Sequence, residues 1–207
     1  MKTQLISATD PDAIPLACEV VRVGGLIAFP TDTLYGLGCD PHSPTALQKI
    51  YAATGRAMSK AIPVLISRPD QLNSLISDFP ERAGKLMEQW WPGALTLVLP
   101  KHAALPQDLT PYPGLAVRMP DHAVALALLN QTGPLAVTSA NLSDHENPRD
   151  AQGVLAQLNG LVDLVLDGGK LTGGQASTII DCMGNEPKLL REGPIPFSEI
   201  LERWHTK

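Results

Sequence analysis

Short, wholly apolar segments alternate along this chain with longer amphipathic segments, and this alternation limits the fold more than any other feature of the sequence. The segment 26–29 is apolar throughout and is followed by Pro30, which is typical of a strand buried on both faces. Residues 11–24 before it carry apolar side chains at helical spacing and end in two glycines. Segments of both kinds in one chain predict an α/β protein with an open, twisted, mixed sheet and flanking helices.

The other elements are predicted from the same apolar spacing and from chain breakers. We expect further helices at residues 43–55, 70–76, 80–91, 121–131, 151–158 and 198–205. We expect further strands at residues 61–66, 95–99, 115–119, 135–138, 161–167, 177–181 and 188–191. The 207 residues contain no linker-like stretch and no solenoid repeat, so residues 1–207 are expected to form a single domain.

Composition excludes several classes of protein. No apolar run approaches the roughly 18 residues that a membrane span needs, and the first residues lack the apolar stretch of a signal peptide, so we expect a cytoplasmic protein without a membrane partner. The three cysteines show no CxxC spacing and are expected to be buried thiols. A formal net charge of −5 argues against a protein whose main partner is a nucleic acid, although it does not exclude a local basic pocket.

Polar side chains recur where apolar strands begin or end. In open α/β sheets, ligands bind at strand ends, where hydroxyl and amide groups can converge without disrupting the core. The co-occurrence of these residues predicts one shared polar cleft, whereas each residue taken singly could be a cap or a turn residue. They are Thr31, Thr33 and Tyr35 after the first apolar strand, Arg118 within another, Ser139 and Asn141 after a third, and Ser177 and Thr178 at the start of a fourth.

Four cationic residues, Arg56, Lys60, Arg118 and Arg191, lie in or beside the same elements. Arg118 and Arg191 are expected inside otherwise apolar strands, where a guanidinium is costly to bury unless it meets an anion. The anion could be a ligand, or it could be a carboxylate of the protein in an internal salt bridge. The sequence leaves both interpretations open.

Several common catalytic devices are missing. No GxxxxGK[ST] motif is present, and the glycines of residues 168–174 lack its spacing, so a P-loop is excluded. No GxSxG surrounds Ser139, and the five histidines form no metal-binding pair or visible triad, so we expect neither serine hydrolysis nor a protein-bound metal. Trp90 and Trp91 could stack on bases, but their place at the end of an amphipathic helix favours core anchors.

Seven segments carry a resemblance to a known family. FPTDTLYGLGCDP, IYAATGRAMSKAIPVLI, WPGALTLVL, LAVRMPDH, TSANLS, STIID and LLREGPI follow one another in the order found in the YrdC/TsaC family, over about residues 10–195. The resemblance implies a twisted α/β sheet with a concave, positively charged cleft. It also implies a nucleotidyltransferase that uses ATP with Mg²⁺, L-threonine and bicarbonate to make L-threonylcarbamoyladenylate and pyrophosphate for modification of tRNA at adenosine 37.

The resemblance also assigns roles to individual residues. It puts L-threonine near Thr33, Arg118, Ser139 and Ser177, with the arginine as a natural partner for the carboxylate. It puts ATP along Arg56, Lys60, Asn141 and Arg191, and it makes Arg56, Lys60, Ser139 and Asn141 the catalytic set. We add Arg149 to the residues expected to bind ATP, although it departs from the family pattern. Thr31 and Tyr35 would form part of the wall of the same cleft.

One position departs from the family pattern. The family's KxR signature has lysine where this chain has Thr54, so a cation expected to face the nucleotide is absent. Lys49 or Lys60 could replace it, although helical spacing does not put Lys49 on the same face. The loop 144–149 after TSANLS also departs from the family pattern, with Arg149 where a hydroxyl is common; Arg149 could restore the charge or could equally be a surface loop residue. The departure at Thr54 motivates an alternative, a divergent paralogue with another carbamoyl or adenylate substrate. A second alternative is an RNA-binding module. In the main interpretation, a downstream tRNA threonylcarbamoyl transferase receives the product, and RNA binding by this chain would be weak.

Overall fold

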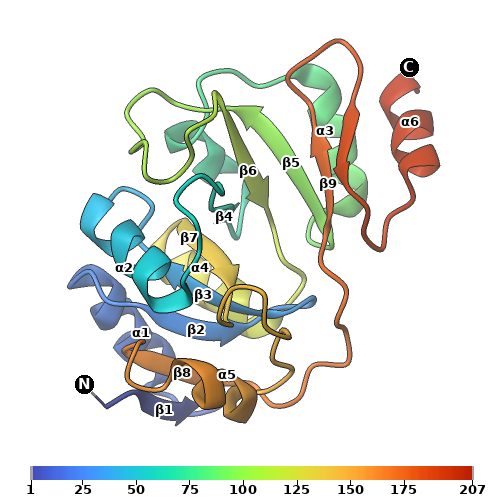
Figure 1. Ribbon diagram of the computed structural model, residues 1–207. Coiled ribbons are helices and arrows are strands. Elements are labelled where there is room, and N and C mark those ends of the chain that lie inside the picture. Colours follow the sequence, from blue (N-terminus) through green and yellow to red (C-terminus); the bar gives the residue numbers. More distant parts are fainter. Residues whose placement is uncertain (1, 207) are drawn as a thin grey trace.

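The computed structural model describes residues 2–206, whose strands form one mixed ten-stranded sheet in the order β1-β8-β2-β3-β7-β4-β6-β5-β9-β10 (Figure 1). The strands are β1 (Gln4–Ser7), β2 (Ile27–Pro30), β3 (Tyr35–Cys39), β4 (Val64–Leu65), β5 (Leu95–Pro100), β6 (Gly114–Arg118), β7 (Leu135–Ser139), β8 (Leu164–Asp167), β9 (Thr178–Asp181) and β10 (Lys188–Arg191). The helices are α1 (Ala13–Arg22), α2 (Pro44–Thr54), α3 (Glu81–Trp90), α4 (Ala123–Thr132), α5 (Ala151–Leu158) and α6 (Phe197–His205), with a 3₁₀ helix at Pro69–Ser74. The predicted mixed sheet with flanking helices is confirmed.

Alternating side chains of the central strands pack into two cores. Ile27 and Phe29 of β2 belong to the core that α1 and α4 cover, whereas Leu26 and Ala28 belong to the larger core that contains buried residues of α2, α3, α5 and α6. Trp91 lies in the larger core, which confirms its prediction as an anchor, and Trp90 packs against that core while partly exposed. Within residues 2–206, none of the helices has the length and apolarity that crossing a membrane requires.

Two strands were not predicted from the sequence. β3 has the sequence YGLGC, and glycine is normally depleted in strands. Here the glycines make room for neighbours, because a Cβ on Gly36 would lie 2.6 Å from Val137 Cγ1 and one on Gly38 would lie 3.0 Å from Phe29 Cε1. β3 is antiparallel to β2, so residues 31–34 form the turn of a hairpin between two interior strands of the sheet. β1 is a four-residue strand at one edge of the sheet, with mostly exposed side chains.

Three predicted elements are shorter than expected or of another kind. The strand predicted at 61–66 is confined to β4, and Pro63 before it has no N–H to donate to a ladder. The strand predicted at 161–167 begins only at Leu164, after a turn that contains Gly160 at φ 81°. The helix predicted at 70–76 is the 3₁₀ helix Pro69–Ser74.

The three thiols differ in burial, and this difference predicts their reactivity. Cys39 and Cys182 are buried, and burial raises the pKa of each to about 12, whereas Cys18 is partly exposed. At pH 8 the native protein should therefore react rapidly with a thiol reagent at Cys18 only, because the thiolate is the reactive species. Denaturant should expose Cys39 and Cys182 and make both thiols reactive. A native protein that reacts at all three thiols with equal rates would contradict these burials.

Candidate functional site

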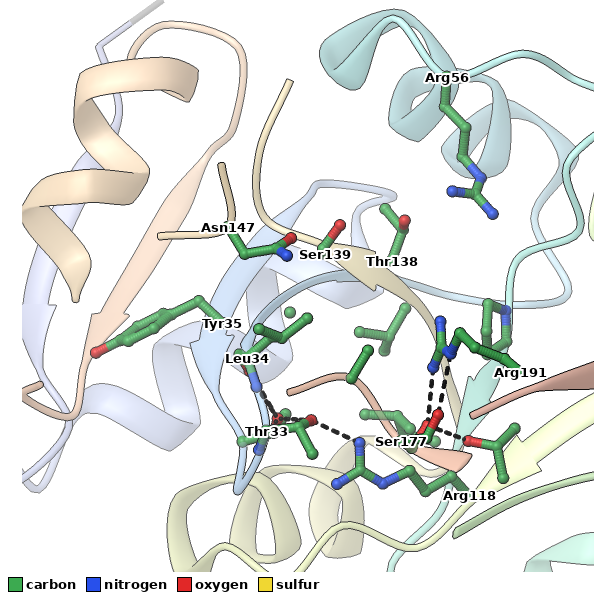
Figure 2. A pocket seen from close by; sticks show the side chains of 17 residues that line it. Thr33, Leu34, Tyr35, Arg56, Arg118, Thr138, Ser139, Asn147, Ser177 and Arg191 are labelled. Atoms are coloured by element: carbon green, nitrogen blue, oxygen red, sulfur yellow. Dashed lines mark hydrogen bonds between the residues drawn. The ribbon is translucent and has the colours of Figure 1, made fainter. Parts of the chain in front are cut away.

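The predicted strand ends converge on a cavity of about 320 Å³ (Figure 2). Its wall is built by the turn between β2 and β3, the ends of β6, β7 and β10, the segment before β9 and the loop after α2. Eight residues predicted from the sequence line it: Thr31, Thr33, Tyr35, Arg56, Arg118, Ser139, Ser177 and Arg191. The wall thus combines hydroxyl groups with three arginines and has no carboxylate.

Arg118 fixes the turn between β2 and β3. Its Nη2 forms an ion pair with Asp32, its Nη1 donates to Thr33 Oγ1 at 2.7 Å, and its Nε donates to the Gly93 carbonyl at 2.8 Å. The Arg118 residue is only 6% exposed, so these contacts replace most of its hydration. Of the two interpretations left open for Arg118, the internal salt bridge is the one present in this structure.

Thr31 and Tyr35 brace the same turn. Thr31 Oγ1 donates to the Leu34 carbonyl at 2.6 Å and lies 3.1 Å from Thr33 Oγ1. The Tyr35 ring points away from the cavity, and its hydroxyl donates to the Gly169 carbonyl at 2.7 Å (Figure 2). Burial raises the pKa of Tyr35 to about 12, so it stays a neutral donor. Tyr35 therefore lines the cavity because it lies beside the β2–β3 turn, and its hydroxyl group does not face the cavity.

Ser177 and Arg191 form the opposite wall. Arg191 Nε donates to the Ser177 carbonyl and Arg191 Nη2 donates to Ser177 Oγ, both at 3.0 Å. Ser177 Oγ also lies 2.7 Å from Thr96 Oγ1, and both hydroxyl-bearing residues are buried. The predicted burial of Arg191 in an apolar strand is wrong, because β10 is an edge strand and Arg191 is exposed. Its guanidinium group nevertheless contacts Ser177 at the cavity wall.

Arg56 is positioned by the end of α2. Gly55 ends the helix in a left-handed conformation at φ 64°, which a glycine adopts without strain, and the chain then turns toward the cavity. Arg56 Nη2 donates to the Ala61 carbonyl at 2.7 Å and Nε donates to the Lys60 carbonyl at 3.3 Å. Figure 2 shows its head group on the far side of the cavity from Arg118.

The three guanidinium groups share one electrostatic environment. Burial lowers the pKa of Arg56, Arg118 and Arg191, and for Arg191 the positive charges of the other two lower it further. A guanidinium nevertheless stays protonated in proteins. Asp32 compensates only Arg118, and no ion pair within residues 2–206 involves Arg56 or Arg191. The cavity therefore holds two cations that an anionic ligand could neutralise.

Three residues predicted to bind ATP do not line this cavity. Lys60 is exposed in the loop after α2. Asn141 Nδ2 donates to the Leu142 and His145 carbonyls at 2.7 and 3.0 Å, which orders the loop after β7, and its buried Oδ1 has no partner. Arg149 is exposed and lines a neighbouring cavity of about 300 Å³, which shares Thr33, Leu34 and Asn147 with the first.

The departure at Thr54 is accommodated inside the fold. Thr54 is 3% exposed, and its hydroxyl donates to the Ile50 carbonyl at 2.7 Å within α2. Lys49 does not replace the missing cation at the cavity, because its Nζ donates to the Gly24 carbonyl at 2.6 Å and it does not line the wall. The cation nearest in sequence that lines the cavity is Arg56.

Three polar residues of the wall were not predicted as site residues from the sequence: Thr96, Thr138 and Asn147. Thr96 and Thr138 lie within apolar strands, and a lone polar side chain at a buried strand position was the signal that could have identified them. Asn147 belongs to a loop, where asparagine is common and gives no such signal. Within residues 2–206, no three His, Cys, Asp or Glu side chains are grouped to hold a metal ion.

Curated proteins provide the first comparison. The chain is 40% identical over 201 residues to a threonylcarbamoyl-AMP synthase of Bacillus subtilis, and the match covers 96% of this chain and 58% of that protein. It is 36% identical over 205 residues to a putative threonylcarbamoyl-AMP synthase of Mycobacterium tuberculosis, with 97% and 94% covered. The chain thus spans little more than half of the first relative and nearly all of the second.

Solved structures and a family model complete the comparison. Sua5 of Pyrococcus abyssi in complex with L-threonine matches with a TM-score of 0.88 and 38% identity over 92% of this chain and 56% of that one. Escherichia coli YciO matches with a TM-score of 0.85 and 28% identity, with 97% and 99% covered. The Sua5/YciO/YrdC family model, described as "telomere recombination", matches residues 19–193. This chain belongs to the Sua5/YciO/YrdC family.

Proposed function

We propose that this protein is a threonylcarbamoyl-AMP synthase, which forms L-threonylcarbamoyladenylate and pyrophosphate from L-threonine, bicarbonate and ATP. The observation that carries the proposal is a cavity lined by Arg56 and Arg191, neither of which has a carboxylate partner within residues 2–206, together with the hydroxyl groups of Thr33 and Ser177. Relatives at 36–40% identity are named for this activity, and the Sua5 of Pyrococcus abyssi has been solved in complex with L-threonine. We also propose that the whole chain acts as one domain, because its ten strands share one sheet.

L-threonine fits the part of the cavity between the two hydroxyl walls. Its carboxylate would lie between Thr33, which Arg118 holds, and Ser177, through which the charge of Arg191 reaches it. Ser139 lies at the end of β7 on the same cavity wall, and its hydroxyl has no partner within residues 2–206, so it can hydrogen-bond to the amino acid. Arg118 would then act mainly by holding Thr33, because Asp32 already neutralises its charge.

ATP would extend from Arg56 and Arg191 toward the neighbouring cavity that Arg149 lines. Mg²⁺ would enter as part of the Mg·ATP substrate, because phosphate oxygens suit this ion and the described residues offer it no carboxylate cluster. Asn141 Oδ1 is a buried acceptor that finds no donor among residues 2–206, which is costly enough that we expect a ligand or a loop movement to supply one. Lys60 would need to swing from its exposed loop to reach a phosphate.

The chemistry proposed needs no nucleophile from the protein. The neutral amine of L-threonine forms a C–N bond to carbon dioxide derived from bicarbonate and loses one proton, so that a carbamate forms and the third oxygen of bicarbonate leaves as water. A carbamate oxygen then attacks the α-phosphorus of ATP, the bond to the β-phosphate oxygen breaks, and pyrophosphate leaves with the electron pair. Holding two reactants in line supplies about 7–11 kcal/mol of barrier reduction, and guanidinium groups stabilise the charge that develops. A site of arginines and hydroxyl groups suits these two tasks.

The proposal predicts pyrophosphate release that depends on all substrates. The purified protein with Mg·ATP, L-threonine and bicarbonate should release pyrophosphate, and omission of either L-threonine or bicarbonate should reduce release to background. L-serine, which lacks one methyl group, should be about 10–200-fold less effective in kcat/KM. Release that continues unchanged without L-threonine would overturn the proposal.

A divergent family member with another substrate is the second candidate, and Thr54 is the observation that favours it. A neutral side chain buried in α2 replaces a cation that the family pattern leads us to expect near the nucleotide. This candidate predicts adenylate formation or hydrolysis with another amino acid or with carbamoyl phosphate, and a parallel screen of these compounds separates the two functions.

The remaining partners follow from the proposed product. A carbamoyl adenylate is a reactive mixed anhydride, so a tRNA threonylcarbamoyl transferase must consume it soon after release, and we propose that both enzymes work in the cytoplasm. Any binding of tRNA by this chain itself would be weak, because the formal net charge is −5.

A further inference from the structure

A pair of buried hydroxyl groups lies at one wall of the cavity. Thr96 of β5 and Ser177 before β9 are 3% and 4% exposed, and their hydroxyl oxygens lie 2.7 Å apart. Arg191 Nη2 donates to the same Ser177 oxygen at 3.0 Å (Figure 2). The oxygen positions alone leave open whether Thr96 or Ser177 supplies the proton between them.

Counting protons and lone pairs shows why the direction matters. A serine hydroxyl has one proton and two lone pairs, and Arg191 already occupies one lone pair of Ser177. If Ser177 donated to Thr96, Ser177 could offer a ligand only its second lone pair. If Thr96 donates to Ser177, both lone pairs of Ser177 are filled and its proton is free to point into the cavity. The first arrangement selects a donor in the ligand, and the second selects an acceptor.

Burial and charge both favour donation from Thr96. Ser177 is the only hydrogen-bond partner of Thr96 Oγ1 within residues 2–206, so donation from Ser177 would leave the Thr96 proton without an acceptor in the protein. A buried donor without a partner is costly. The guanidinium groups of Arg56 and Arg191, which have no ion-pair partner within residues 2–206, also favour anionic ligand groups, which accept hydrogen bonds. The free proton of Ser177 would meet such a group.

We propose that Thr96 is a positioning residue that turns Ser177 into a hydrogen-bond donor for the carboxylate of L-threonine. The inference rests on the proposed function and adds a residue that acts on the substrate through Ser177. Thr33 on the opposite wall also accepts from Arg118, at 2.7 Å, but its proton has an acceptor in the protein: Thr31 directs its own proton to the Leu34 carbonyl, so Thr31 Oγ1, 3.1 Å away, can accept from Thr33. Each wall therefore presents a hydroxyl group that an arginine holds by one lone pair.

The test compares Thr96→Val, which removes the hydroxyl with little change of shape, with Thr96→Ser, which keeps it. Calorimetric titration of the intact protein should show L-threonine binding about tenfold weaker to Thr96→Val than to the wild type, and Thr96→Ser should bind within about twofold of the wild type. Thr110→Val is the matched control, because Thr110 is fully buried, makes its own hydroxyl hydrogen bond to the Gly114 carbonyl at 3.3 Å and does not line the cavity.

Two further measurements separate positioning from a general structural role. L-threoninol, which lacks the carboxylate, should bind the wild type and Thr96→Val with equal, weak affinity. Thr96→Val should weaken L-threonine binding no further in a Ser177→Ala background, because the effect passes through Ser177. Equal L-threonine affinity of Thr96→Val and the wild type, or additive losses in the double variant, would overturn the inference alone. A wild type that binds no L-threonine would overturn the proposed function and the inference together.

Discussion

Arg118→Ala should lower the free energy of unfolding by about 3–5 kcal/mol, because it leaves Asp32 in the protein interior without its counter-ion. The Asp32 side chain is 19% exposed, so water can compensate only part of the loss. The substitution also removes the hydrogen bonds to Thr33 and to the Gly93 carbonyl, which connect the β2–β3 turn to the segment before β5. Urea unfolding measures the effect.

A variant without either charge and a surface control make this prediction specific. Asp32→Asn combined with Arg118→Met should cost less than Arg118→Ala alone, because no uncompensated charge remains. Arg68→Ala removes an ion pair with Asp70 whose partners are 50% and 63% exposed, and it should change stability by less than about 1 kcal/mol. An Arg118→Ala protein within 1 kcal/mol of the wild type would show that the ion pair does not hold the turn.

Arg56→Ala should have the second large effect, a decrease of about 10²–10³-fold in kcat/KM for pyrophosphate release. The reason is that Arg56 offers the cavity a cation without a carboxylate partner, at the place where phosphate charge would develop. Arg56→Lys should recover part of the rate, because it keeps the charge and loses the planar fork. Steady-state kinetics with varied ATP measures the change.

The control for this prediction separates catalysis from folding. Arg56 also donates to the Lys60 and Ala61 carbonyls, so its removal loosens the loop after α2. The melting temperature of each variant should therefore be measured beside its rate, and Arg22→Ala, which removes an exposed arginine on α1, should change neither. A kcat/KM within tenfold of the wild type for a folded Arg56→Ala protein would remove Arg56 from the catalytic set.

The elements that were predictable from the sequence are those whose local residue pattern matches the burial of their side chains in the fold. The apolar run that forms β2 and the capped helix α2, with Ser43 accepting from the Ala46 N–H at 3.2 Å, were both predicted. β3 could not be predicted from propensity, because its glycines are required by side chains of other strands. The pairing of β3 with β2 and β7 is a long-range property that no local window contains.

The candidate site divides in the same way. Arg118 and Ser177 were predicted because a polar residue at the end of an apolar strand is visible in the sequence. Thr96 was missed because its role depends on the parallel pairing of β5 with β9, which brings it to Ser177 from 81 positions away. Asn141 was assigned to the nucleotide, but its amide group bonds to its own loop, and the sequence could not show where that loop folds.

The most direct test of the proposed function is to identify the product. The protein should be incubated with ¹⁴C-bicarbonate, L-threonine and Mg·ATP, and the nucleotides should be separated by chromatography and identified by mass spectrometry. We expect one labelled compound that contains AMP, L-threonine and the carbon of bicarbonate in equal amounts, and this compound should be absent when L-threonine is omitted. An adenylate without the labelled carbon, or no adenylate at all from a folded protein that binds ATP, would contradict the function proposed for this cavity.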